Sequence, residues 1–295
     1  MPPPSTPSWA APTLQQPSNL RARLKNGQLL VGVGLAYPSV HVAKTLAVTG
    51  ADWCWIDAEH VAWSPSLLTQ VIQVIIHESG GRTIPVVRVP SKTAFDYMAW
   101  CLDAGAGGII VPHIETEEEV AAVVAACRFP PLGHRSYSPF FLPGVMDKTP
   151  PGETTYSIAN KHVAVIPQIE SRLGIANLDA IMRNPQVDGV VIGAGDLRLD
   201  MGLPISLNGT ETAYAAALLR VFSLAKQYNM PLICLALGAK QIEARLAEGF
   251  TVLVVSLDLH ALAFAVMREL EKARKVDEGL QRTRSGDEVR VISKL

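Results

Sequence analysis

Two carboxylates, Glu170 and Asp196, each end a short apolar run that is typical of a buried strand. The runs are Val163–Glu170 (VAVIPQIE) and Gly189–Asp196 (GVVIGAGD). Strands buried on both faces belong to parallel sheets covered by helices, and ligands bind beyond their carboxyl ends. We therefore expect both carboxylates in one mouth, where they repel each other unless a hard divalent cation such as Mg²⁺ neutralises them. The alternative is that both acids only cap the helices that follow.

A histidine and an aspartate nearer the N-terminus could take part in proton transfer. His60 follows the predicted strand that ends at Asp57. Because histidine titrates near neutral pH, it can act there as a general base. A histidine bonded only to the loop backbone is the alternative. Asp103 precedes a later strand and could orient such a histidine.

Two further features are suited to binding an anion. Arg88 lies in an otherwise apolar strand, where a guanidinium needs an anionic partner. That partner is either a substrate carboxylate or, in a structural ion pair, Asp57 or Asp103. The small residues of Gly193–Asp196 (GAGD) expose backbone N–H groups where the next helix begins, which is a geometry that binds a carboxylate.

Alternating strand-like and helix-like segments would position these residues. The predicted strands are Leu29–Leu35, Trp53–Asp57, Ile84–Val89, Gly108–Pro112, Val163–Glu170, Val190–Gly193, Leu232–Leu237 and Val252–Leu257. Predicted helices include Asn19–Asn26, Ser66–Glu78, Thr116–Cys127, Thr212–Tyr228 and Lys240–Glu248. About eight β–α repeats in ~250 residues predict an α/β fold, a (β/α)₈ TIM barrel. A doubly wound open sheet is the alternative.

The composition describes a globular chain with a large core. Of 295 residues, 48% are hydrophobic and 18% are charged. The net charge of −1 gives no electrostatic basis for binding nucleic acid or an anionic membrane. The four cysteines show no close pairing, and this predicts buried, reduced thiols.

Three segments divide the chain. Residues 1–18 are rich in Pro, Ser and Thr, and we expect them to form a disordered leader. We expect residues 19–270 to form the barrel domain and residues 271–295 to form a charged tail. The apolar stretch Thr251–Met267 contains Asp258 and His260, so we expect a strand running into a helix rather than a membrane span.

Several ordered motifs together resemble one enzyme family. They are DWCWIDAEH, PVVRV, LDAGAGGIIVPHIET, RFPPLGHRS, QIESRLGIANLDAI and VDGVVIGAGDLRLDMG. The chain resembles, over about Leu29–Leu270, the metal-dependent class II pyruvate aldolases of the HpcH/HpaI aldolase/citrate lyase superfamily, including its fungal macrophomate-synthase-like branch.

This resemblance implies a role for each candidate residue. Glu170 and Asp196 would hold Mg²⁺, Mn²⁺ or Co²⁺, with Glu59 in the second shell ordering a metal-bound water. Arg88 and Gln168 would contact the keto acid, and the Gly195 and Asp196 amides its carboxylate. His60 would be the acid/base residue, paired with Asp103.

The resemblance also implies the reaction and the partners. The enzyme would form or cleave 4-hydroxy-2-keto acids through a pyruvate enolate bound to Mg²⁺, with pyruvate or oxaloacetate and an aldehyde or other electrophile as substrates. An oxaloacetate decarboxylase or an enolate-trapping synthase is the alternative, and a CoA-ester lyase or a non-catalytic scaffold fits less well. Homo-oligomers, hexamers or trimers, with exchanged C-terminal helices would be expected.

Two departures from the family pattern leave the acceptor pocket open. The loop that contains Asp196 reads GAGDLR, where the family typically has GPADLS. Val61-Ala62-Trp63 follows His60 in place of the more usual Ala-Pro. Trp63, His113 and the long irregular segment Arg128–Gly152 are the candidates for lining this pocket.

The final residues Ser293-Lys294-Leu295 match a peroxisomal address. In a eukaryotic source we expect the import receptor to bind this tripeptide; otherwise the protein would be cytoplasmic. An N-terminal fluorescent fusion should therefore enter peroxisomes, and deletion of Leu295 should leave it in the cytosol with its activity unchanged. A cytosolic pattern for both proteins would contradict the address.

Overall fold

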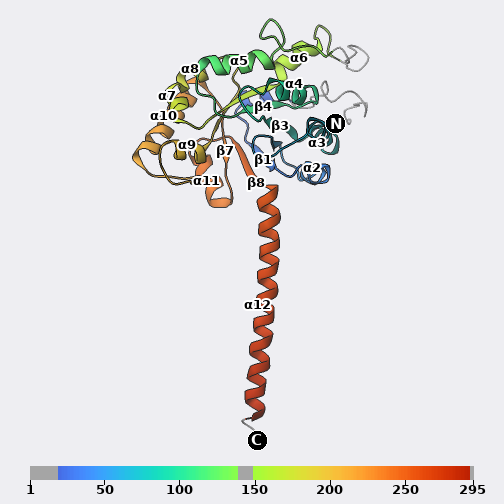
Figure 1. The fold of residues 1–295 in the computed structure, drawn as a ribbon, viewed down its shortest axis with the longest axis vertical. Coiled ribbons are helices and arrows are strands. Elements are labelled where there is room, and N and C mark those ends of the chain that lie inside the picture. Colours follow the sequence, from blue (N-terminus) through green and yellow to red (C-terminus); the bar gives the residue numbers. More distant parts are fainter. Residues whose placement is uncertain (1–18, 139–148, 293–295) are drawn as a thin grey trace.

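Eight parallel strands close into a barrel (Figure 1). The computed structural model describes residues 19–138 and 149–292, so the expected leader lies outside the described residues. The strands pair in sequence order and β8 returns to pair with β1, which confirms the (β/α)₈ barrel and excludes the open sheet. They are β1 (Leu30–Leu35), β2 (Trp53–Asp57), β3 (Ile84–Arg88), β4 (Gly108–Val111), β5 (Ala164–Ile169), β6 (Val190–Ile192), β7 (Leu232–Leu235) and β8 (Val252–Leu257).

Helices surround the strands (Figure 1). They are α1 (Leu20–Lys25), α2 (Val40–Ala47), α3 (Pro65–Glu78), α4 (Phe95–Asp103), α5 (Glu117–Cys127), α6 (Thr155–His162), α7 (Arg172–Ala176), α8 (Leu178–Arg183), α9 (Ala194–Asp200), α10 (Thr212–Tyr228), α11 (Ala239–Ala247) and α12 (Asp258–Ile292). Several begin at side-chain caps that the sequence encodes, such as the Thr116–Glu119 capping box of α5.

The strands separate two apolar cores because alternate side chains point to opposite faces. In β2, Trp53 and Trp55 fill the barrel interior, whereas Cys54 and Ile56 pack outward against the helices. All four cysteines are buried free thiols, as predicted. Burial raises the pKa of the Cys127 thiol to about 11, which keeps it protonated at neutral pH.

The segment that follows α5 starts at the N-terminal end of the barrel. Arg128 is fully buried there, and its Nη2 donates to Asp188 Oδ2 at 2.9 Å, while Arg21 Nε donates to Asp188 Oδ1 at 2.5 Å. Asp188 precedes β6, so this ion network fastens the end of the barrel opposite the mouth. The middle of the expected loop, residues 139–148, lies outside the described residues.

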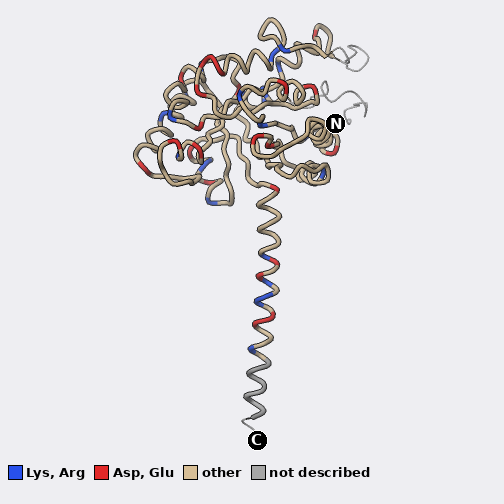
Figure 2. The backbone as a smooth tube through the Cα atoms, in the orientation of Figure 1, with Lys and Arg blue, Asp and Glu red and all other residues tan. Residues whose placement is uncertain are grey.

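The last helix leaves the barrel. β8 runs directly into α12, which spans 35 residues and crosses the expected boundary at residue 270 without a break (Figure 1). Its first turns carry exposed apolar side chains, including Leu262 and Val266. After Asp258 at its start, the next charged residue is Arg268, and charges of both signs follow along the helix (Figure 2). Over the part of the chain with described structure, no helix combines the length and apolarity needed to cross a membrane. Ser293-Lys294-Leu295 falls outside the described residues.

Candidate active site

Glu170 is a buried carboxylate at the C-terminal end of β5. Its side chain is 1% exposed, Oε1 accepts a hydrogen bond from the His113 backbone N–H at 2.9 Å, and Oε2 accepts one from Gln168 Nε2 at 2.6 Å. Burial raises the pKa of the Glu170 carboxyl above its ordinary range, because no lysine or arginine of the described residues forms an ion pair with it. This carboxylate would be stabilised by a cation.

Gly193 lets the end of β6 approach Glu170 closely. A Cβ atom at Gly193 would lie 2.3 Å from Glu170 Oε2 and 2.7 Å from Glu170 Cβ, closer than any side chain could be accommodated. Gly193 is also the N-cap of α9, and Asp196 lies in the first turn of that helix. The GAG sequence therefore places the start of α9 against Glu170, in keeping with the expected pairing of the two acids in one mouth.

Arg88 is held by two carboxylates at the end of β3. Its Nε and Nη2 donate to the two oxygens of Asp57 at 2.9 and 2.7 Å, and its Nη1 lies 2.9 Å from Glu59 Oε2. Its guanidinium lies over the Trp55 ring, 5.1 Å from the ring centroid. The structural ion pair with Asp57 is therefore formed, and Arg88 nevertheless lines the cavity described below.

The structure does not bring His60 and Asp103 together within one chain. Asp103 is the last residue of α4, which returns to the N-terminal end of the strands, and it accepts a hydrogen bond from Arg135 Nη2 at 2.6 Å. His60 lies beyond the C-terminal end of β2, at the other end of the barrel. Its side chain is 66% exposed, and its Nε2 lies 3.6 Å from Glu59 Oε2. The expected pair is wrong for a single chain because a helix of a β–α repeat ends at the opposite side of the barrel from the strand end that precedes it.

The predicted acceptor-pocket residues separate in the structure. Trp63 is buried in the outer core, and its Nε1 donates to the Asp57 carbonyl at 2.7 Å, so it supports the β2 loop instead of lining a pocket. His113 does reach the mouth. Ligand atoms of Glu59, His113 and Glu170 lie within 4.8 Å of one another, a grouping that could hold a metal ion. The resemblance implied that Glu59 orders a metal-bound water, and His113 was a candidate for the acceptor pocket; the two residues follow β2 and β4 at the same mouth.

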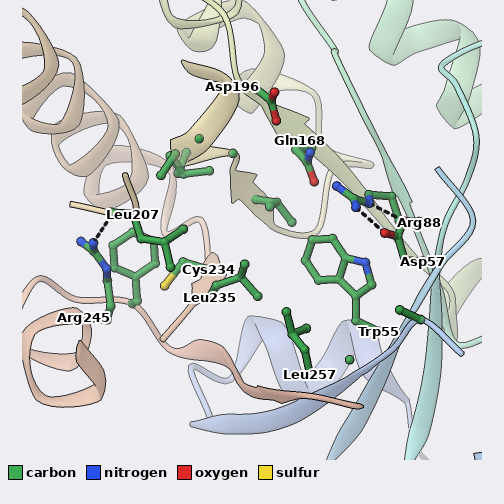
Figure 3. A pocket seen from close by; sticks show the side chains of 18 of the residues that line it. Trp55, Asp57, Arg88, Gln168, Asp196, Leu207, Cys234, Leu235, Arg245 and Leu257 are labelled. Atoms are coloured by element: carbon green, nitrogen blue, oxygen red, sulfur yellow. Dashed lines mark hydrogen bonds and ion pairs between the residues drawn. The ribbon is translucent and has the colours of Figure 1, made fainter. Parts of the chain in front are cut away.

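A cavity of about 330 Å³ is lined by residues of the strand ends and of the barrel interior, and it adjoins Glu170 through Gln168 (Figure 3). Its polar wall contains Asp57, Arg88, Gln168, Gly195 and Asp196, and its apolar wall contains Trp55, Val191, Leu235 and Leu257. Gln168 is 2% exposed, yet its Oε1 has no hydrogen-bond partner among the described residues. Since a buried acceptor without a partner is costly, the cavity is suited to a ligand that donates a hydrogen bond.

Comparison with known proteins identifies the family. The family model HpcH/HpaI aldolase/citrate lyase matches residues 33–265. The chain belongs to this family. The 5-keto-4-deoxy-D-glucarate aldolase of Salmonella newport is 30% identical over 261 residues, which cover 88% of this chain and 98% of that protein. The chain is thus an enzyme of an aldolase and lyase family, as its motifs predicted.

Solved structures of similar sequence share the barrel. Macrophomate synthase superimposes with a TM-score of 0.83 and 34% identity, covering 89% of this chain and 91% of its own. The citrate synthase SbnG gives a TM-score of 0.75 and 26% identity, covering 88% of this chain and 99% of its own. This chain is therefore similar both to a protein named as an aldolase and to proteins named as synthases.

The mouth of this HpcH/HpaI barrel fits a divalent cation. Asp57, Glu59, Glu170 and Asp196 lie at or near the mouth with Arg88, and the other guanidinium of the cavity wall, that of Arg245, is paired with Glu248, so negative charge is in excess. Oxygen donors in excess over cationic side chains are what Mg²⁺ and Mn²⁺ require. Asp196 lines the cavity but lies outside the group of three formed by Glu59, His113 and Glu170.

We expect Gly193→Ala to weaken divalent-cation binding by about tenfold or more, the usual cost of disturbing the partners that orient a ligand. The added methyl group must displace Glu170. Gly195→Ala is the matched control, because its Cβ meets no atom within 4 Å. Titration calorimetry of both variants measures the effect, and equal affinities in the two would contradict the close packing of Gly193 on Glu170.

Proposed function

We propose that this enzyme is a divalent-metal-dependent carbon–carbon lyase that forms or cleaves 4-hydroxy-2-keto acids. The observation that carries the proposal is the buried Glu170 carboxylate, which accepts a hydrogen bond from Gln168, a residue that lines the same cavity as Arg88 and Asp196. The 30% identity to a curated keto-acid aldolase supports the same reaction class.

Glu170 and Asp196 are the proposed metal ligands, and Glu59 would orient a water on the ion. When bound, Mg²⁺, Mn²⁺ or Co²⁺ would supply Lewis-acid polarisation of the keto acid. Glu170 is already oriented for this by Gln168 Nε2 and by the His113 N–H, so little reorganisation is needed on binding.

Arg88 is the proposed stabiliser of the negative charge that develops on the keto oxygen. Its bidentate bond to Asp57 fixes the guanidinium plane before substrate binds, and a preorganised donor is worth more than a mobile one. Gln168 would contact the keto acid from β5. The backbone N–H groups of Gly195 and Asp196, in the first turn of α9, would receive its carboxylate.

His60 is the proposed general acid and base for the aldehyde end of the substrate. Its ring is exposed at the mouth and lies beside Glu59, which can accept a proton or hold the ring orientation. Asp103 of the same chain lies at the opposite end of the barrel and cannot serve as its partner. We propose that Asp103 acts from a neighbouring copy.

An oxaloacetate decarboxylase or enolate-trapping synthase is the second candidate. It is favoured by the 34% identity to macrophomate synthase and by the apolar wall formed by Trp55, Leu235 and Leu257. Both reactions begin from the same enolate. Incubation with oxaloacetate and no aldehyde, followed by measurement of CO₂ release, separates this candidate from an obligate aldolase.

We also propose a homo-oligomer, a hexamer or trimer built through α12. Val33 of β1 and Val255 of β8 face outward yet are only half-buried, because α12 extends away from them. The apolar side chains of Leu262, Phe264 and Val266 on α12 are exposed in the single chain. Packing this segment on the outward faces of β1 and β8 in a second copy would bury both surfaces.

Glu170→Gln and Asp196→Asn should each abolish turnover and divalent-cation binding while leaving the thermal unfolding temperature of the metal-free protein unchanged or higher. The two carboxylates would repel each other, and Glu170 is desolvated, when no cation is bound. Calorimetric metal titration and keto-acid turnover measure the two effects. Full activity after EDTA treatment would refute the metal-dependent reaction.

His60→Ala should slow aldol cleavage by about 10²-fold or more, the usual contribution of a positioned acid/base group. Oxaloacetate decarboxylation should fall less, because loss of CO₂ generates the enolate without removal of a proton from substrate. The ratio of the two kcat values is the measurement. Equal losses would show that His60 serves binding or structure instead.

The double substitution Leu262→Glu and Val266→Glu should reduce the wild-type oligomer to a species of 31.7 kDa in light scattering, because charge cannot be buried in the exchanged contact. Arg274→Glu, on the charged outer half of α12, is the matched control and should keep the wild-type mass. A wild-type chain that is already a monomer would contradict the proposal.

A further inference from the structure

His113 occupies a constrained position beside Glu170. It follows β4 directly and adopts a positive φ of 52°, in the left-handed region that non-glycine residues rarely enter. This backbone conformation directs its N–H to Glu170 Oε1 and brings its ring Nδ1 to 3.6 Å from the same oxygen. The ring itself is 53% exposed at the mouth.

The backbone around His113 is fastened on both sides. Lys92 Nζ donates to the His113 carbonyl at 3.0 Å, and the next N–H, that of Ile114, donates to the Gln168 carbonyl at 3.2 Å. Lys92 is itself held by Glu119 at 2.6 Å. The imidazole is therefore carried by a rigid segment although its ring is exposed.

The distance between the His113 ring and the Glu170 carboxylate suits two ligands of one ion better than a hydrogen-bonded pair. At 3.6 Å, Nδ1 is too far from Oε1 for a hydrogen bond. Two ligand atoms on one octahedral ion, each about 2.1 Å from it, are about 3 Å apart when adjacent and about 4.2 Å when opposite. The 3.6 Å between His113 Nδ1 and Glu170 Oε1 lies between these two values, and the ligand atoms of Glu59, His113 and Glu170 are all within 4.8 Å of one another.

A second observation also indicates a bound group here. The Oε1 atom of Gln168, a residue 2% exposed, has no partner among the described residues, while its Nε2 is committed to Glu170. A water or hydroxyl on an ion held by Glu170 would donate to this oxygen and satisfy it. The position of His113 thus coincides with a site that has both a desolvated carboxylate and a buried acceptor awaiting a donor.

We propose that the His113 imidazole is an additional ligand of the divalent ion, so that the site prefers Co²⁺ to Mg²⁺. This assignment rests on the proposed function, because it requires that Glu170 hold an ion. Imidazole suits the later transition metals, whereas Mg²⁺ prefers oxygen ligands and keeps several waters. A nitrogen from His113 in place of one water therefore favours the transition metals.

The test compares metal affinities of the full chain, freed of metal, by calorimetric titration with Co²⁺ and with Mg²⁺. His113→Asn is the informative variant, since asparagine accepts the left-handed conformation and keeps the N–H bond to Glu170 while removing the imidazole. His134→Asn, at an exposed position near the end of α5, is the matched control. Pulsed EPR of the Mn²⁺-loaded protein adds a direct signature, the modulation from a coordinated ¹⁴N nucleus.

His113→Asn should lower Co²⁺ affinity on the order of tenfold or more, since even partners outside the ligand set usually cost that much. Mg²⁺ affinity should change by less than about threefold, because water replaces a poor ligand, and the ¹⁴N modulation should disappear. Equal changes for both ions, or an unchanged ¹⁴N signal, would overturn the role of His113 while Glu170-dependent binding kept the proposed function intact. A wild-type chain that binds neither ion would overturn both.

Discussion

The desolvated carboxylate of Glu170 is the constraint on which the mouth of the barrel depends. Burying an ionised carboxylate without a cation is costly, so its surroundings must supply partial charges until a cation arrives. The Gln168 amide supplies such a charge from β5, and the His113 N–H supplies another from the segment that follows the neighbouring strand β4. Gly193 then allows the end of β6, which Asp196 follows in the first turn of α9, to pack against the same carboxylate. The ends of β4, β5 and β6 therefore all contribute to the surroundings of this one side chain.

The second electrostatic feature is the sharing of one cation by two acids. Arg88 bonds to Asp57 with two donors and approaches Glu59 with a third nitrogen, so it is neutralised and fixed in orientation. A guanidinium held in this way cannot neutralise Glu170 as well. The mouth therefore retains an excess of negative charge that a divalent ion would balance, while the Arg88 plane stays oriented for a substrate oxygen.

The strands and the strand-end residues could be predicted because both follow from local pattern. Apolar runs that end in polar residues define parallel strands, and the barrel order places Arg88, Gln168 and Glu170 at one end. The pairing of His60 with Asp103, which the resemblance implied, does not form within one chain because α4 carries Asp103 to the opposite end of the barrel. The position of His113 beside Glu170 depends on a left-handed non-glycine residue and on a neighbouring strand, neither of which is visible in local sequence.

The C-terminal helix shows that a charged segment without a sustained apolar pattern can still be helical. The segment beyond residue 270 was expected to be a charged tail, but opposite charges four residues apart, as in Glu271 and Lys275, support a solvated helix. Apolar side chains in the first turns of α12, such as Leu262 and Phe264, are exposed in the single chain. His60 likewise lacks an acidic partner from the far end of its own barrel. Since one neighbouring copy would provide a surface for the helix and an acid for the histidine, oligomerisation and catalysis in this enzyme are expected to depend on the same contact.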